Sequence, residues 1–122
     1  MQWKFSGGSP VYQQIMDQLR GAIVAGEFSP GDRIPPVREL AARAQVNPNT
    51  MQRALLELER EGLLVPDSTI GRYVTREEGV LEAMKQQAID AEVRACAARL
   101  RDLGLSMAEA AELLLRLQEE SP

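Results

Sequence analysis

Two proline signals, Pro35-Pro36 and Asn47-Pro48, divide the middle of the chain into two short helices. Proline is excluded from the interior of a helix but fits its first turn, so each signal marks where a helix begins. Apolar residues recur at helical spacing after each signal, at positions 37, 40, 41 and 44 and at positions 51, 54, 55 and 58. Asn47 is a good cap for the second helix, and Gly62 is a typical stop. The pattern predicts a helix-turn-helix.

The neighbouring segments complete a small domain. An earlier helix begins at Pro10, with Ser9 as its cap, and ends at Gly26. Residues 3–5, before it, alternate apolar and polar and would form a short strand or a packed arm. After Gly62, two β-prone runs at residues 63–65 and 72–74 flank a turn-rich tip, which predicts a hairpin, or wing. The order of helix, helix, helix and hairpin predicts a winged helix-turn-helix over residues 1–76.

The remainder, residues 77–122, reads as two further helices. A long acidic helix runs from about 78 to 103, and Gly104 stops it. Ser106 and Glu109 then form a capping box that opens a last helix, which buries Ala110 and several leucines. The predicted fold class is therefore mainly α, a winged helix-turn-helix with a small β-hairpin followed by two C-terminal helices.

The formal charge of −4 is unevenly distributed along the chain. Residues 1–76 carry nine lysines and arginines against eight acidic residues, whereas residues 77–122 carry five against ten. This asymmetry places the basic share with the helix-turn-helix and the acidic share with the C-terminal helices. Even so, the first segment is close to neutral, which is a weak footprint for a protein that binds nucleic acid.

Enzymatic chemistry has little support in the composition. The chain has no histidine, which removes the commonest general base and metal ligand, and a single cysteine, Cys96. A carboxylate-only enzyme stays open, but no catalytic constellation supports it, and we expect no metal and no cofactor. Cys96 is expected to be a buried small hydrophobe, with a redox switch as the alternative. Without an apolar run long enough for a membrane span or a signal peptide, we expect a cytoplasmic protein.

The start of the second helix-turn-helix helix carries the candidate nucleic-acid contacts. A recognition helix reads bases with its first turns, and Asn, Gln, Thr and Arg can each contact base edges or phosphates in the major groove. The candidates on this helix are Asn47, Asn49, Thr50, Gln52 and Arg53, joined by Arg38 and Arg43 on the preceding helix and by Gly71 and Arg72 at the wing. Any exposed helix can have a polar first turn, so Arg43 and Arg53 could equally be solvated or ion-paired.

A string of short motifs in fixed order makes the chain resemble one family. Residues 10–75 contain P-x-Y-x-Q-I, A-I-x-x-G, P-G-D-R-I-P, V-R-E-L-A, V-N-x-N-T and L-E-x-E-G-L. This segment resembles the DNA-binding domain of GntR-family transcriptional regulators. The V-N-P-N-T form and the short C-terminal region are similar to the YtrA-like subfamily. That resemblance implies two C-terminal helices used for dimerisation and control of transporter operons.

The family's DNA contacts transfer only where residues match. The resemblance implies that Arg38 and Thr50 touch DNA and that Gly71 lies in the wing. Several positions depart from the family pattern. Pro36 replaces Ser or Ala, Pro48 and Gln52 stand where Arg is frequent, and Thr69 replaces Gly at the tip. Operators of other members are therefore not expected to apply here.

The C-terminal helices carry two apolar seams that a partner chain would cover. Two-fold pairing also spaces recognition helices by one turn of DNA. The alternative is that both helices fold back on their own winged domain. Residues expected at the dimer interface are Leu81, Met84, Ala88, Ile89, Val93, Cys96, Leu100, Leu113, Leu114 and Leu117.

Two helices of this length cannot enclose a drug-sized pocket within one chain. Any small-molecule effector is therefore expected at the dimer interface or between helix and winged domain. The leading functional hypothesis is a homodimeric repressor that binds an inverted repeat in double-stranded DNA, without contact to membranes. The alternative is a winged-helix protein-interaction module that does not bind DNA.

Overall fold

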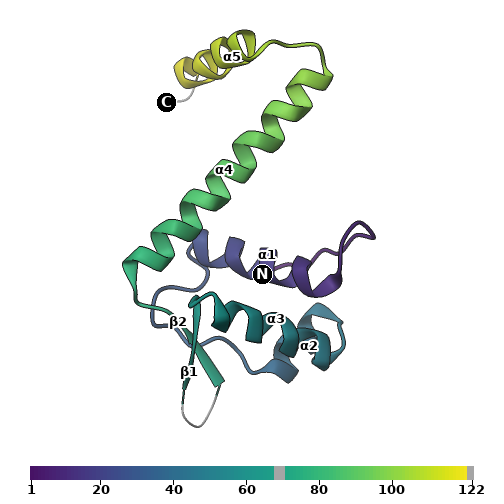
Figure 1. Ribbon diagram of the computed structural model, residues 1–122, viewed down its shortest axis with the longest axis vertical. Helices are drawn as coiled ribbons and strands as arrows, with labels where there is room; N and C mark the ends of the chain where they lie inside the picture. Colours follow the sequence, from purple (N-terminus) through teal and green to yellow (C-terminus); the bar gives the residue numbers. More distant parts are fainter. Residues whose placement is uncertain (68–70, 121–122) are drawn as a thin grey trace. The chain divides into compact units, whose positions relative to one another are not determined.

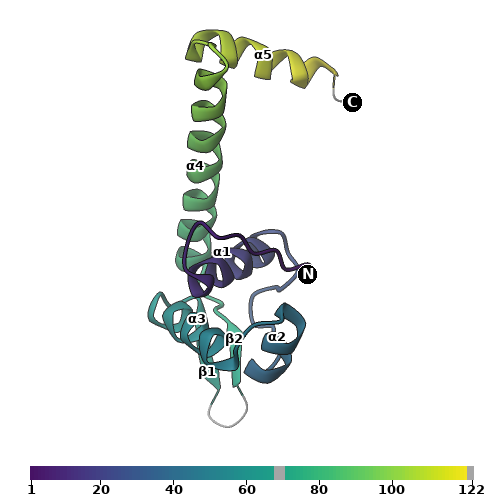
Figure 2. The same ribbon diagram turned by 90° about the vertical axis from the view of Figure 1, so that its right-hand side faces the viewer.

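The computed structural model describes residues 1–67 and 71–120, which form helices and one hairpin (Figures 1 and 2). The elements in chain order are α1 (Val11–Val24), α2 (Val37–Ala44), α3 (Pro48–Arg60), β1 (Leu64–Asp67), β2 (Gly71–Val74), α4 (Glu78–Asp102) and α5 (Met107–Glu120). The predicted fold class is confirmed. The chain divides into two compact units, Met1–Lys85, the winged unit, and a C-terminal unit that begins at Gln86.

Helix α3 is the central element of the winged unit. It packs against α1, α2 and β1, and its apolar side is fully buried. Apolar residues of all three helices lie in one core, to which the strand residues Leu64 and Val74 also belong. Because α3 contributes Met51, Ala54, Leu55 and Leu58 to this core, its opposite side is left to solvent.

The predicted helix signals act at α3 as expected. Asn47 adopts an extended backbone, and its side-chain oxygen accepts a hydrogen bond of 2.7 Å from the backbone N–H of Asn49. Pro48 occupies the first turn, and Gly62 follows the helix with a φ of 80°. Before the cap, Gln45 takes the left-handed conformation, at φ 56°, that makes the tight turn after α2.

The predicted cap of α1 is wrong. Pro10 itself is the N-cap residue, and no side chain caps the helix. The Pro10 carbonyl accepts the N–H groups of Gln13 and Gln14 instead, because the ψ of 141° at Pro10 places Ser9 outside the first turn. Ser9 contributes only its carbonyl, which accepts a hydrogen bond from the Gln14 side chain.

Residues 1–9 form a packed arm rather than a strand. The side-chain amides of Gln14 and Gln18, one turn apart on α1, bond to the arm's backbone as a neighbouring strand would. Gln18 exchanges hydrogen bonds of 2.9 and 2.8 Å with the N–H and carbonyl of Lys4, and Gln14 does the same with Ser6. Apolar periodicity gives no signal for such amide pairing, so it was not predicted.

The wing is a two-stranded antiparallel hairpin with Val65 opposite Tyr73 and Asp67 opposite Gly71. The loop before α2 runs along the free edge of β2. The N–H of Gly31 donates to the carbonyl of Val74 at 2.8 Å, and the N–H of Ile34 donates to the carbonyl of Arg72 at 3.0 Å. The wing is therefore attached by its backbone to the segment that enters the helix-turn-helix.

The C-terminal unit contains the rest of α4, from Gln86, and α5. The predicted capping box is confirmed: Glu109 donates its N–H to the Ser106 hydroxyl, and Ser106 donates its N–H to the Glu109 carboxylate, both at 3.1 Å. These backbone and side-chain hydrogen bonds from Ser106 lower the pKa of Glu109 below its ordinary value.

Burial in this unit is less than expected. Ala110 is buried, but Leu113, Leu114 and Leu117 are 45%, 55% and 56% exposed. Within residues 1–67 and 71–120, no helix combines the length and apolar content that a membrane span requires.

Candidate nucleic-acid interface

The exposed side of α3 presents the polar residues expected at a recognition surface. Asn49 and Arg53 are exposed, and Thr50 and Gln52 are half-buried at the edges of this side. Asn47 is exposed at the start of the helix, where its side-chain oxygen accepts the capping hydrogen bond from Asn49. Five of the predicted contact residues are therefore brought together by the first two turns of one helix.

Within residues 1–76, ion pairs with arginines neutralise most of the acidic side chains. Each acidic side chain within residues 1–67 and 71–76 has a partner. Six of them pair with arginines: Asp17 and Glu61 with Arg20, Glu39 with Arg43, Glu57 with Arg60, Glu59 with Arg72, and Asp67 with Arg33. Glu27 lies 3.7 Å from the N-terminal amine, and Asp32 accepts the N–H of Ser29 at 2.8 Å.

Four basic side chains within residues 1–67 and 71–76, Lys4, Arg38, Arg53 and Arg76, have no carboxylate partner among the described residues. Two of these four belong to the predicted contact set. The near-neutral total therefore hides cations at the helix-turn-helix that are available for phosphate.

Arg38 is the simplest of these cations. It is exposed in the first turn of α2, where the backbone N–H groups of a helix start add to the attraction for an anion. Arg43, on the next turn, forms an ion pair with Glu39, four residues earlier. Of the alternatives considered for Arg43, the structure therefore shows the ion-paired one.

Arg53 is held by an aromatic ring rather than by a carboxylate. Its guanidinium carbon lies 3.8 Å from the centre of the Tyr12 ring, which α1 supplies. A guanidinium stacked on a ring keeps its N–H groups free at the edge, where a phosphate or a base can accept them. The sequence spacing of Tyr12 along α1 gives no signal for this contact.

The structure places Arg72 differently from the predicted DNA contact. Its side chain is 11% exposed and pairs with Glu59 of α3, itself 20% exposed. Arg72 lies on the face of the hairpin that packs toward α3, because β1 contacts α3 directly. The pair therefore joins the wing to the recognition helix. Gly71 is exposed, with a φ of 112° that favours glycine. Thr69, predicted to reshape the tip, lies outside the described residues.

An α-helix whose outward side carries amide, hydroxyl and guanidinium groups matches the major groove of DNA in size and chemistry. Helix α3 spans about 20 Å at ~1.5 Å per residue. The groove is about 12 Å wide and presents donors and acceptors that asparagine, glutamine and arginine can pair with. The arrangement can therefore contact both bases and phosphates.

Comparison with known proteins agrees with this geometry. Residues 11–74 match the family model described as bacterial regulatory proteins, gntR family. The chain is 32% identical over 109 residues to the uncharacterized HTH-type transcriptional regulator YhcF of Bacillus subtilis, covering 89% of this chain and 90% of that protein. It is 39% identical over 85 residues to the HTH-type transcriptional repressor YtrA of the same organism, covering 65% of each.

Solved structures show the same fold. A GntR family transcriptional regulator from Listeria monocytogenes aligns with 97% of this chain and 100% of its own, with a TM-score of 0.79 and 27% identity. The DNA-binding domain of AraR, solved in complex with operator ORX1, aligns with 62% of this chain and 99% of its own, with a TM-score of 0.56 and 26% identity.

The different environments of two arginines make a testable contrast. Arg72→Ala should lower the free energy of unfolding by about 3 kcal/mol, because it leaves Glu59 poorly solvated and unpaired. Arg43→Ala removes the same charge from an exposed pair and should cost less than about 1 kcal/mol. Urea denaturation of the two variants measures both values. A loss of less than about 1 kcal/mol for Arg72→Ala as well would contradict a structural role of the Arg72–Glu59 pair.

Proposed function

The chain belongs to the GntR family of bacterial regulatory proteins and carries its DNA-binding domain, and from this premise we propose that it is a homodimeric repressor that binds an inverted-repeat operator. The name of the relative YtrA and the operator complex of AraR support repression and operator binding. In the proposal residues 1–76 bind DNA in the cytoplasm and residues 77–122 dimerise. A transporter operon is the proposed target, on the resemblance to the YtrA-like subfamily alone.

The observation that carries the proposal is the outward side of α3. In the bound state, Asn49 and Gln52 pair with base edges, and Thr50 offers its methyl or hydroxyl to a neighbouring base. Asn47 contributes its side-chain amide nitrogen at the helix start. Arg38 and Arg53, which lack carboxylate partners, neutralise phosphates on either side of the groove.

The wing has a reduced role in this proposal. Gly71 lets the hairpin approach the DNA backbone, since it carries no side chain to clash. Arg72 supports the recognition helix α3 through its ion pair with Glu59. Base recognition is therefore assigned to α3, and the wing is assigned to orientation.

The C-terminal unit supports dimerisation through apolar side chains that it leaves exposed. Leu103, Leu115 and Val93 are 79%, 64% and 61% exposed, and Ile89 and the α5 leucines add to them. Monomeric proteins rarely expose apolar surface on this scale, and a second copy of the chain would bury it in a homodimer. A hollow of about 470 Å³, lined by Val93, Cys96, Leu100 and Leu114 among others, would receive apolar side chains of that copy.

Two residues predicted at the dimer interface are left out of the proposal. Met84 is part of the winged unit's own core, and Leu81 packs against that core. The first two turns of α4 are therefore bound to the winged unit, and the proposed interface begins near Ala88.

DNA binding is tested with a duplex selected from a random pool by the full-length protein. Arg38→Ala should weaken binding and reduce the slope of log affinity against log salt by about 0.9, as expected for one lost phosphate contact. Thr50→Ala should cost about 1–3 kcal/mol on the selected duplex and leave that slope unchanged. Arg43→Ala, which removes an arginine that already pairs with Glu39, is the matched control.

The outcomes separate the two functions considered. Normal affinity in both Arg38→Ala and Thr50→Ala would show that α3 does not read DNA. If no duplex is preferred over the pool at any salt concentration, the winged-helix protein-interaction module is the better account.

Dimerisation is tested in the full-length chain with Leu114→Glu and Leu117→Glu, alone and together. A charge buried without a partner costs several kcal/mol, so the double variant should be a folded monomer by light scattering and should bind the duplex much more weakly. Leu56→Glu, at a leucine 39% exposed on α3, is the control and should remain dimeric. A dimer mass for the double variant would contradict the proposed interface.

A further inference from the structure

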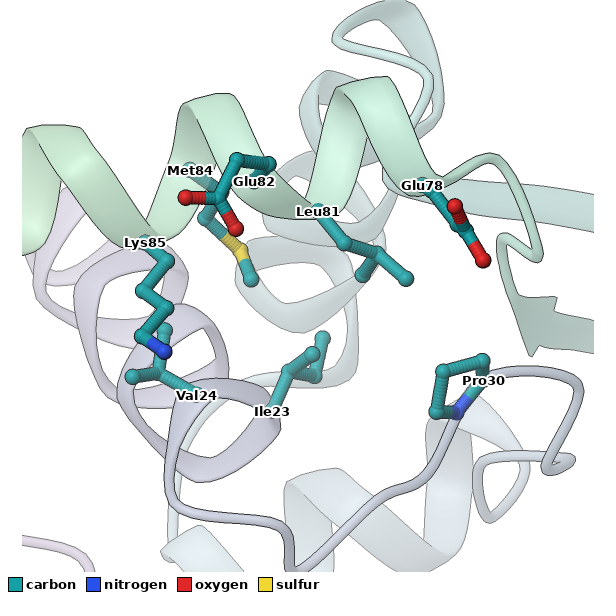
Figure 3. A pocket seen from close by; sticks show the side chains of 8 residues that line it. All are labelled: Ile23, Val24, Pro30, Glu78, Leu81, Glu82, Met84 and Lys85. Atoms are coloured by element: carbon teal, nitrogen blue, oxygen red, sulfur yellow. The ribbon is translucent and has the colours of Figure 1, made fainter.

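A second hollow lies wholly within the winged unit. Its volume is about 450 Å³, within the range of small-molecule sites. The end of α1 contributes Ile23 and Val24, the following loop contributes Pro30, and the first turns of α4 contribute the remaining side chains (Figure 3). We refer to it below as the α1–α4 pocket.

The floor of the α1–α4 pocket is apolar. Leu81 and Met84 extend from α4 toward Ile23 of α1 (Figure 3). Ile23 and Met84 are 8% and 9% exposed, so the floor is continuous with the core of the winged unit. A hydrocarbon group of a ligand would rest on this floor, and the flexible thioether of Met84 can adapt to its shape.

Charged groups stand only at the edge of the pocket, on α4. Glu78 and Glu82 are four residues apart, which places their carboxylates on the same side of the helix. Glu78 is exposed and has no hydrogen-bond or ion-pair partner among the described residues. Lys85 extends toward Val24 at the other end, two helical turns from Glu78 (Figure 3).

We propose that the α1–α4 pocket binds a small organic monocation with a hydrocarbon body, such as an alkylammonium compound. The hydrocarbon body covers Ile23, Leu81 and Met84, and the cationic group lies between Glu78 and Glu82. Two carboxylates against one ammonium favour a cation over an anion. Lys85 at the opposite end repels a second positive charge, so the site discriminates against dications.

The position of the pocket gives ligand binding a consequence for regulation. A ligand there contacts both the end of α1 and the first two turns of α4, and α4 continues without interruption to Asp102. Occupancy therefore restrains the helix that carries the proposed dimerisation residues. This effector role rests on the proposed function, whereas ligand binding itself does not.

Ligand binding is tested by NMR on full-length protein labelled at the methionine methyl groups. Three six-carbon probes share one body: hexyltrimethylammonium, hexamethonium with a charge at each end, and hexanesulfonate. The monocation should shift the Met84 signal saturably, and Met51 in the core and Met107 in the C-terminal unit should not respond. No Met84 shift, or an equal response to hexanesulfonate or hexamethonium, would overturn the proposed site.

Matched variants locate the cation. Glu78→Gln and Glu82→Gln should each weaken monocation binding about threefold, and together about tenfold, as expected for partly exposed ion pairs. Glu77→Gln changes the same charge one residue away, outside the pocket, and should bind normally. Equal weakening by Glu77→Gln would show a diffuse charge effect and overturn the assignment of the cation to the two carboxylates.

The effector role is tested separately on the selected duplex. Saturating hexyltrimethylammonium should change duplex affinity by about fivefold or more in the unmodified protein, and much less in the Glu78→Gln/Glu82→Gln variant. Unchanged affinity at saturation would overturn the effector role. If no duplex is selected at all, the proposed function fails, while the Met84 signal still reports on the ligand site.

Discussion

The winged unit depends on one constraint, the burial of a single side of α3. Met51, Ala54, Leu55 and Leu58 fill the space between α1, α2 and β1, and each of these side chains is almost inaccessible to solvent. Because the helix has one buried side, rotation about its axis would expose these residues at a cost of about 1.5–3 kcal/mol for each large one. The direction in which Asn49, Gln52 and Arg53 point is therefore fixed by packing on the opposite side.

Ion pairing decides which of the exposed basic side chains remain available to bind phosphate. Residues 1–76 are close to neutral in total charge, but their described acidic side chains are occupied by partners, in ion pairs such as Glu61 with Arg20 and Glu59 with Arg72. Arg38 and Arg53 lie outside these pairs. A protein can thus present cations to a polyanion without a basic composition, provided that its acidic groups are occupied internally.

Much of the fold could be predicted from the sequence, because local signals decide it. Proline, asparagine and glycine mark the ends of α3, and the Ser106–Glu109 box opens α5 as expected. Contacts between elements could not be predicted from these local signals. Arg72 was predicted to contact DNA, but its side chain pairs with Glu59 of α3. The alternation of residues along a strand does not indicate which charged side chain of a neighbouring helix lies opposite. Met84 was assigned to the dimer seam but belongs to the core, because both uses require the same apolar spacing on α4.

The central claim, that packing presents the start of α3 to a DNA groove, is tested most directly by following backbone amide signals during titration with the selected duplex. The account predicts that the largest shifts fall at Asn49, Thr50, Gln52 and Arg53, with smaller shifts in the first turn of α2. Shifts confined to the C-terminal unit, with α3 unaffected at saturation, would contradict it.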